Sequence, residues 1–215
     1  MKTTWSKRTD LLVRTLAGGC RPRFQLELAH WLEDSSRFQT FVTRHQDKVR
    51  KKLSTTDEEA RLDVRAELLV AQRLLSDRRF EVAFEAYGAQ RLGPDLSIAF
   101  RTNQRFNVEV TRLRGAQGVD AVRLANVIGG KLRQLPVDLP NVLVVVGQEL
   151  SVTMQGLVET IRIVKSRSDP RYPRLGGVIT LDEPTAVNFW SNPEARHPVP
   201  PPAVKAALAC LKQAV

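Results

Sequence analysis

Residues 93–111 have the sequence GPDLSIAFRTNQRFNVEVT, and they decide how the rest of the chain is interpreted. After an initial Gly-Pro turn signal come two runs, 95–100 and 106–111, in which alternate residues are apolar, joined by a polar connection. Alternation with a period of two is typical of half-buried strands, so this stretch predicts a β-hairpin. In the second strand Glu109 and Thr111 share the face opposite to the apolar one.

Two carboxylates lie at corresponding places in this hairpin. Asp95 opens the first strand, where it shares a face with Ser97, and Glu109 lies within the second. Neighbouring strands can bring such side chains together, and paired carboxylates suit a hard cation such as Mg²⁺ or Mn²⁺. The alternative is an exposed pair of acids on a solvated sheet face.

A third carboxylate, Glu67, lies in the predicted helix 57–77. Four apolar residues fall within about 40° of one line at 100° per residue, namely Ala60, Val64, Ala71 and Leu74. Glu67 lies on that same line. Burial of a carboxylate costs several kcal/mol unless a cation or a metal compensates it, so a partner is expected. Alternatively, Glu67 lies at the rim of the packed face and pairs with an arginine.

These residues resemble the PD-(D/E)XK, or restriction-endonuclease-like, superfamily. Pro94-Asp95 matches the first half of the motif that names the family, and Glu109-Val110-Thr111 occupies the second half. The family core runs helix, three antiparallel strands, helix and strand. This chain has the same order, at residues 57–77, 80–86, 95–100, 106–111, 117–135 and 141–147. The resemblance covers roughly residues 57–181.

The resemblance implies an α/β fold with a central mixed β-sheet flanked by helices. It further implies a nuclease that hydrolyses phosphodiester bonds of DNA with Mg²⁺ or Mn²⁺. Asp95 and Glu109 would bind the metal, and Glu67 would bind it directly or through water. The alternative function is a catalytically inactive relative that binds nucleic acid or protein, with the carboxylates in a polar network.

One residue departs from the family motif, because Thr111 stands where the family has a lysine. That lysine supplies a positive charge beside the attacked phosphate, which threonine cannot do. Lys131 on the next predicted helix is a candidate substitute, since it lies about 60° from the apolar residue Ile128. The alternatives are that Arg112 or Arg114 supplies the charge and that Lys131 is a solvated lysine. Gln134 resembles a glutamine that RecB-like members place near the metal.

The amino-terminal quarter carries most of the net charge. The whole chain has a net charge of +10 and a pI near 10.2. Residues 1–56 contain twelve Lys or Arg against five Asp or Glu, a net of +7, which leaves +3 for the rest. This helical extension ends in a basic cluster of five residues: Arg44, Lys48, Arg50, Lys51 and Lys52. We expect the cluster to bind nucleic-acid phosphates, unless it is a solvated face or a dimerisation element that makes the chain a homodimer.

The carboxyl-terminal half predicts further α/β units. A helix at 151–165, capped by Ser151, and a strand at 176–181 continue the alternation, so the later strands should be parallel within one mixed sheet. A proline-rich segment and a closing helix at 203–213 follow. We therefore divide the chain into a basic helical extension (1–56), an α/β core (57–183) and a carboxyl-terminal segment packed on the core (184–215).

The composition argues against a membrane-spanning, a secreted or a disulfide-rich protein. No run of eighteen apolar residues is present, so we expect no membrane span. The amino terminus lacks the apolar stretch of a secretory signal, which favours a cytoplasmic location. Two cysteines, Cys20 and Cys210, are too few for a disulfide framework or a zinc site.

Overall fold

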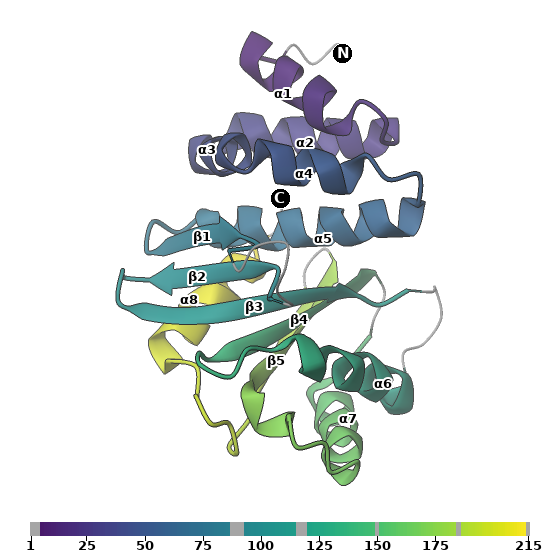
Figure 1. The fold of residues 1–215 in the computed structure, drawn as a ribbon, viewed down its shortest axis with the longest axis vertical. Coiled ribbons are helices and arrows are strands. Elements are labelled where there is room, and N and C mark those ends of the chain that lie inside the picture. The colour runs from purple at the N-terminus through teal and green to yellow at the C-terminus, as the bar shows by residue number, and fades with distance from the viewer. Residues whose placement is uncertain (1–4, 87–92, 115–119, 149–150, 184–185, 214–215) are drawn as a thin grey trace. The chain divides into compact units, whose positions relative to one another are not determined.

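The computed structural model describes residues 5–86, 93–114, 120–148, 151–183 and 186–213. Its internal contacts divide the chain into two compact units, Met1–Ser76 and Asp77–Val215. The first unit is helical and the second is α/β (Figure 1). The predicted α/β fold with a helical amino-terminal region is therefore confirmed. The division falls after residue 76, whereas the sequence places a boundary before helix 57–77.

The amino-terminal unit is built from five helices in the part of it that the structure describes. They are α1 (Lys7–Ala17), α2 (Pro22–Asp34), α3 (Ser36–Arg44), α4 (Gln46–Leu53) and α5 (Glu58–Leu75). Polar residues begin several of them, because the first amides of a helix need acceptors. The side chain of Ser35, for example, accepts from the amide of Phe38. Trp31 and Phe38 are almost fully buried and pack edge to face at the centre of this unit.

The described part of the second unit contains an open, mixed, six-stranded sheet. In spatial order its strands are β1 (Phe80–Phe84), β2 (Leu96–Phe100), β3 (Gln104–Arg112), β4 (Asn141–Gln148), β5 (Leu175–Glu183) and β6 (Ala186–Ser191). Strands β1 to β3 are antiparallel, β3 to β5 are parallel, and β6 is antiparallel to β5. The predicted hairpin and the predicted parallel strands are confirmed. Strand β6 was not predicted.

Helices cover both faces of this sheet (Figure 1). Helices α6 (Ala121–Lys131) and α7 (Met154–Ser166) pack together on one face, and α8 (Pro201–Leu211) lies on the other. The core under α6 and α7 includes Leu124 and Ile128 from α6, with Leu143 and Val178 from β4 and β5. Burial of such side chains contributes about 1.5–3 kcal/mol each and fixes α6 against the sheet.

Several helix boundaries differ from the sequence prediction, and α8, for example, spans Pro201–Leu211 rather than 203–213. Of the expected helix 117–135, residues 117–119 lie outside the described residues, α6 ends at Lys131, and a 3-10 turn (Leu132–Gln134) follows. The prediction that Ser151 caps α7 is wrong. Thr153 is the cap, because its side chain accepts from the amide of Gly156 at 3.1 Å, while Ser151 has a φ of 48° ahead of the helix.

Among the described residues, no helix is both long enough and apolar enough to cross a lipid bilayer.

Candidate functional site

Asp95 and Glu109 lie opposite each other at one end of the hairpin. The last residue pair between β2 and β3 is Leu96 with Val108, and the next step of the register places Asp95 across from Glu109. Beyond that pair, the carboxylate oxygen Oδ2 of Asp95 accepts a hydrogen bond of 2.8 Å from the amide of Val110. This bond fixes the Asp95 side chain to β3. The hairpin thus holds Glu109 on β3 and Asp95 directly before β2.

Glu109 lies on the face of the sheet that α6 covers. Its parallel neighbour on β4 is Leu143, a core residue under α6 and α7. The Glu109 side chain is only 3% exposed, so its charge requires compensation. That compensation comes from Lys131 at the carboxyl end of α6, whose Nζ lies 2.7 Å from Glu109 Oε1.

Gln134 completes this arrangement. The Lys131 ammonium also donates to Gln134 Oε1 at 3.0 Å, which orients Lys131 between the amide and the carboxylate. The Lys131 side chain is 26% exposed, so it is accessible to solvent while its ammonium contacts Glu109. The structure therefore brings together Glu109, Lys131 and Gln134, three of the site candidates predicted from the sequence. Asp95 lies across from Glu109, on the β2 side of the hairpin.

Thr111 lies two residues after Glu109 on the same strand and is partly exposed. Its hydroxyl carries no charge, so Thr111 cannot itself supply a cation beside Glu109. The other two candidates, Arg112 and Arg114, follow at the end of β3, where Arg112 is partly exposed and Arg114 is exposed. Lys131 at the end of helix α6 supplies a cation that contacts Glu109.

Glu67 is buried on α5, with 6% of the residue exposed, as its place in the apolar line predicts. Its compensating cation is Lys52, at the end of α4, whose Nζ lies 2.9 Å from Oε1 and 2.7 Å from Oε2. This pair lies within the amino-terminal unit. It gives Glu67 a structural role in fastening α4 to α5.

The basic cluster of the helical extension divides into two parts. Arg44, Lys48, Arg50 and Lys51 are exposed on α3 and α4. Arg50 also contacts Asp47 at 3.2 Å. Lys52 is partly buried in its pair with Glu67. Four of the five predicted phosphate-binding side chains thus face solvent.

The donor set at Asp95 and Glu109 fits a hard divalent cation in its chemistry. Both residues offer carboxylate oxygens, and Mg²⁺ is commonly held by one or two carboxylates while it keeps several waters. Within the described ranges, no group of three or more His, Cys, Asp or Glu side chains is placed to hold one metal ion. A cation at this place would therefore rest on the pair and on water.

Sequence reasoning missed a second polar cluster on the same face of β3. Asn107 donates to Asn141 Oδ1 at 3.1 Å, and the Asn141 amide donates to the carbonyls of Pro136, Leu139 and Arg174. Both asparagines are fully buried. These bonds fasten the start of β4 to the loops around it. The signal was available, because Asn107 shares its face with Glu109, but its partner is 34 residues away.

Comparison with known proteins finds no family model, no curated protein and no solved structure that matches this chain.

Proposed function

We propose that this protein is a Mg²⁺- or Mn²⁺-dependent nuclease that hydrolyses phosphodiester bonds of DNA on a core like that of the PD-(D/E)XK superfamily. The observation that carries the proposal is the group formed by Asp95, Glu109 and Lys131. Asp95 directly precedes β2, one register step beyond the pair of Leu96 and Val108, which puts it across from Glu109 on β3. A lysine ammonium lies 2.7 Å from Glu109.

The order of elements supports the proposal. Strands β1, β2 and β3 are antiparallel and consecutive, α6 follows, and β4 then pairs parallel with β3. This is the succession of strands and helix that the resemblance implies. The acidic residues lie at its second and third strands, where the family motif places them.

Each side chain has a distinct task in this proposal. Asp95, fixed by its bond from the amide of Val110, and Glu109 would hold the cation. A bound Mg²⁺ supplies an activated water and offsets charge on the phosphate. Lys131 would take the place of the lysine that the family motif has at the position of Thr111. Its ammonium would orient the attacked phosphate. Gln134 would keep Lys131 in position.

The basic extension supports a polyanionic substrate. Exposed Arg44, Lys48, Arg50 and Lys51 would bind phosphates without regard to base sequence.

A specific observation favours the alternative of an inactive module that binds nucleic acid or protein. Lys131 neutralises Glu109 by direct contact, Lys52 does the same for Glu67, and Thr111 has no charge. Two of the three carboxylates thus have their charge neutralised by a lysine without a metal. In this alternative the two ion pairs are structural, and the basic extension alone carries the function.

A DNA-cleavage assay distinguishes the nuclease from the inactive binding module. We would incubate supercoiled plasmid and single-stranded DNA with Mn²⁺ and with Mg²⁺, using the wild type, Asp95→Asn and Lys131→Met. Asparagine keeps an acceptor for the Val110 amide, so Asp95→Asn should fold but lose activity by at least 100-fold. Asp138→Asn, at an exposed position, is the matched control and should cut like the wild type. Wild-type protein that leaves both substrates intact would support the inactive module.

A further inference from the structure

Strand β6 lies at an edge of the sheet. The strand order ends with β5 and β6, and within the part of the chain that the structure describes β5 is the strand that pairs with β6. Edge strands present a row of amides and carbonyls that can pair with another chain, and proteins usually protect them with charge, proline or bulges. The sequence of β6, AVNFWS, contains neither charge nor proline. The other edge strand, β1, carries Glu81.

The register shows which amides of β6 point outward. Asn192 donates to the carbonyl of Gly176 at 3.0 Å, and Ser191 pairs with Gly177. In an antiparallel ladder hydrogen-bonded pairs alternate with pairs that are not bonded. The amides of Asn188 and Trp190 therefore point to β5. The amides and carbonyls of Val187, Phe189 and Ser191 point to the open edge.

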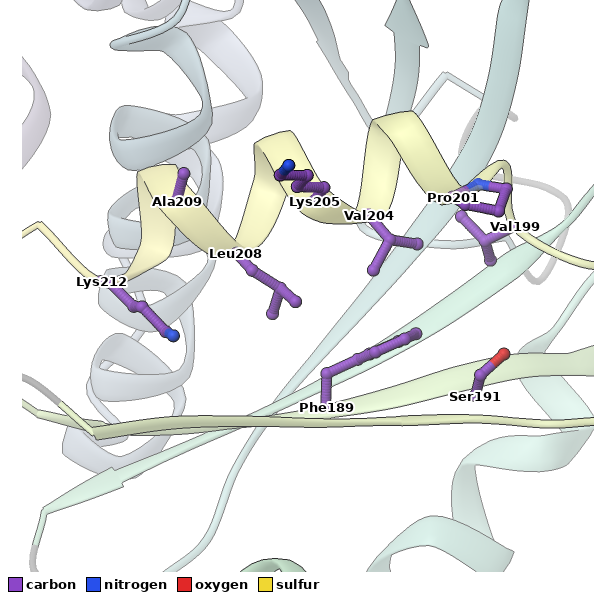
Figure 2. Close-up of a pocket in the computed structure, with 9 residues that line it drawn as sticks. All are labelled: Phe189, Ser191, Val199, Pro201, Val204, Lys205, Leu208, Ala209 and Lys212. Atoms are coloured by element: carbon purple, nitrogen blue, oxygen red, sulfur yellow. The ribbon is translucent and has the colours of Figure 1, made fainter.

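The side chains of two of these edge-facing residues line a groove. Phe189 and Ser191 line one wall, and α8 forms the other with residues that include Val204 and Leu208 (Figure 2). The groove has a volume of about 590 Å³. Phe189 points toward α8, whereas Trp190 packs on the opposite face against the core under α7. An added strand would thus find backbone partners on these three residues and an apolar surface at Phe189 and the facing side chains of α8.

Charge at the groove selects the kind of partner. Lys205 on α8 and Lys212 directly after it are both exposed and line the groove, and no Asp or Glu is among the described residues that line it. A strand that bonds to β6 would carry side chains past these two ammonium groups. Acidic side chains would be attracted there and basic ones repelled.

We propose that β6 and the groove beside α8 bind an extended segment of another protein, added as a seventh strand, in which apolar residues alternate with Asp or Glu. The apolar side chains would enter the groove against Phe189, and the acids would face Lys205 and Lys212. A second copy of this chain is the weaker occupant, because pairing β6 with β6 would bring four lysines toward one interface. This inference is independent of the nuclease proposal.

Hydrogen exchange tests the edge itself. In the free protein, the amides of Val187, Phe189 and Ser191 should exchange at least 10-fold faster than those of Asn188 and Trp190 on the same strand. A peptide of nine residues that alternates Val or Phe with Glu should slow the three fast amides and leave the other two unchanged. Fast amides that stay fast at saturating peptide would overturn the proposal.

Binding of the same peptide, labelled with a fluorophore, tests the chemistry of the partner. We expect saturation below about 1 mM and a loss of at least 10-fold when alternate peptide amides are methylated. The double variant Lys205→Glu, Lys212→Glu should lose a similar factor. Arg105→Glu, Arg133→Glu makes the same charge change at two exposed positions elsewhere in this unit and should bind normally. Equal affinity for the methylated peptide, or a dimer of the free chain that the Lys205→Glu, Lys212→Glu variant strengthens, would contradict the proposal.

Discussion

At the scale of single residues, the contribution of the pair of Lys131 and Glu109 to the free energy of unfolding can be measured. Lys131→Met leaves a carboxylate that is 3% exposed without the cation that contacts it at 2.7 Å. Breaking a fully buried pair costs about 3–5 kcal/mol. Lys131 is partly exposed, so we expect a loss of about 2 kcal/mol in the free energy of unfolding by urea. The double variant with Glu109→Gln should recover part of it, and a loss below about 0.5 kcal/mol would contradict this account of the pair.

A second residue-scale prediction concerns Asp169. The Arg171 side chain donates to both of its carboxylate oxygens, at 2.8 and 2.7 Å, and this holds the pKa of Asp169 at about 2, below its ordinary value of 3.8. A depressed carboxyl pKa stabilises the fold above about pH 4, and that contribution is lost as the pH falls through 2. Carboxyl ¹³C NMR should show Asp169 titrating near 2 and moving toward 3.8 in Arg171→Gln. Titration near 3.8 in the wild type would count against the interaction.

At the scale of elements, the turn between β2 and β3 is strained. Arg101 and Thr102 have φ angles of 49° and 67°, in the left-handed region that costs an ordinary residue roughly 1–2 kcal/mol. Glycine removes this cost, but it also gives the unfolded chain more conformational freedom, which lowers the stability of the fold by about 0.4–1 kcal/mol. Thr102→Gly should therefore raise the free energy of unfolding by about 0.5 kcal/mol. The matched substitution Arg162→Gly, inside α7, should lower it by about 1 kcal/mol, and a loss in both variants would refute the strain.

The elements also show what local pattern can predict. The period of two predicted that Asp95 and Glu109 lie on neighbouring strands of one hairpin, and helical phase allowed Lys131 to reach the sheet, where it contacts Glu109. Strand β6 was not predicted, because Phe189 and Trp190 are adjacent apolar residues that pack on opposite faces of the sheet, and this hides the alternation of apolar and polar residues. The pair of Lys52 and Glu67 joins residues on two different helices, α4 and α5. It depends on tertiary packing that no local pattern contains.

At the scale of the whole molecule, charge governs the proposed binding of DNA. Seven of the ten net positive charges lie in residues 1–56. Each phosphate contact contributes about 0.9 to the slope of log affinity against log salt concentration. Replacing Arg44, Lys48 and Lys51 with Gln should reduce that slope by roughly 2 to 3. Fluorescence anisotropy with labelled duplex DNA measures it, and an unchanged slope would place the DNA contacts elsewhere.

The most direct test of the central claim is calorimetric titration of Mn²⁺ into the wild type and into Asp95→Asn. If Asp95 and Glu109 form a metal centre, the wild type should bind about one ion per chain and the variant should show no saturable heat. Circular dichroism should confirm that both proteins are folded. Absence of metal binding in the wild type, or equal binding in the variant, would contradict the nuclease proposal.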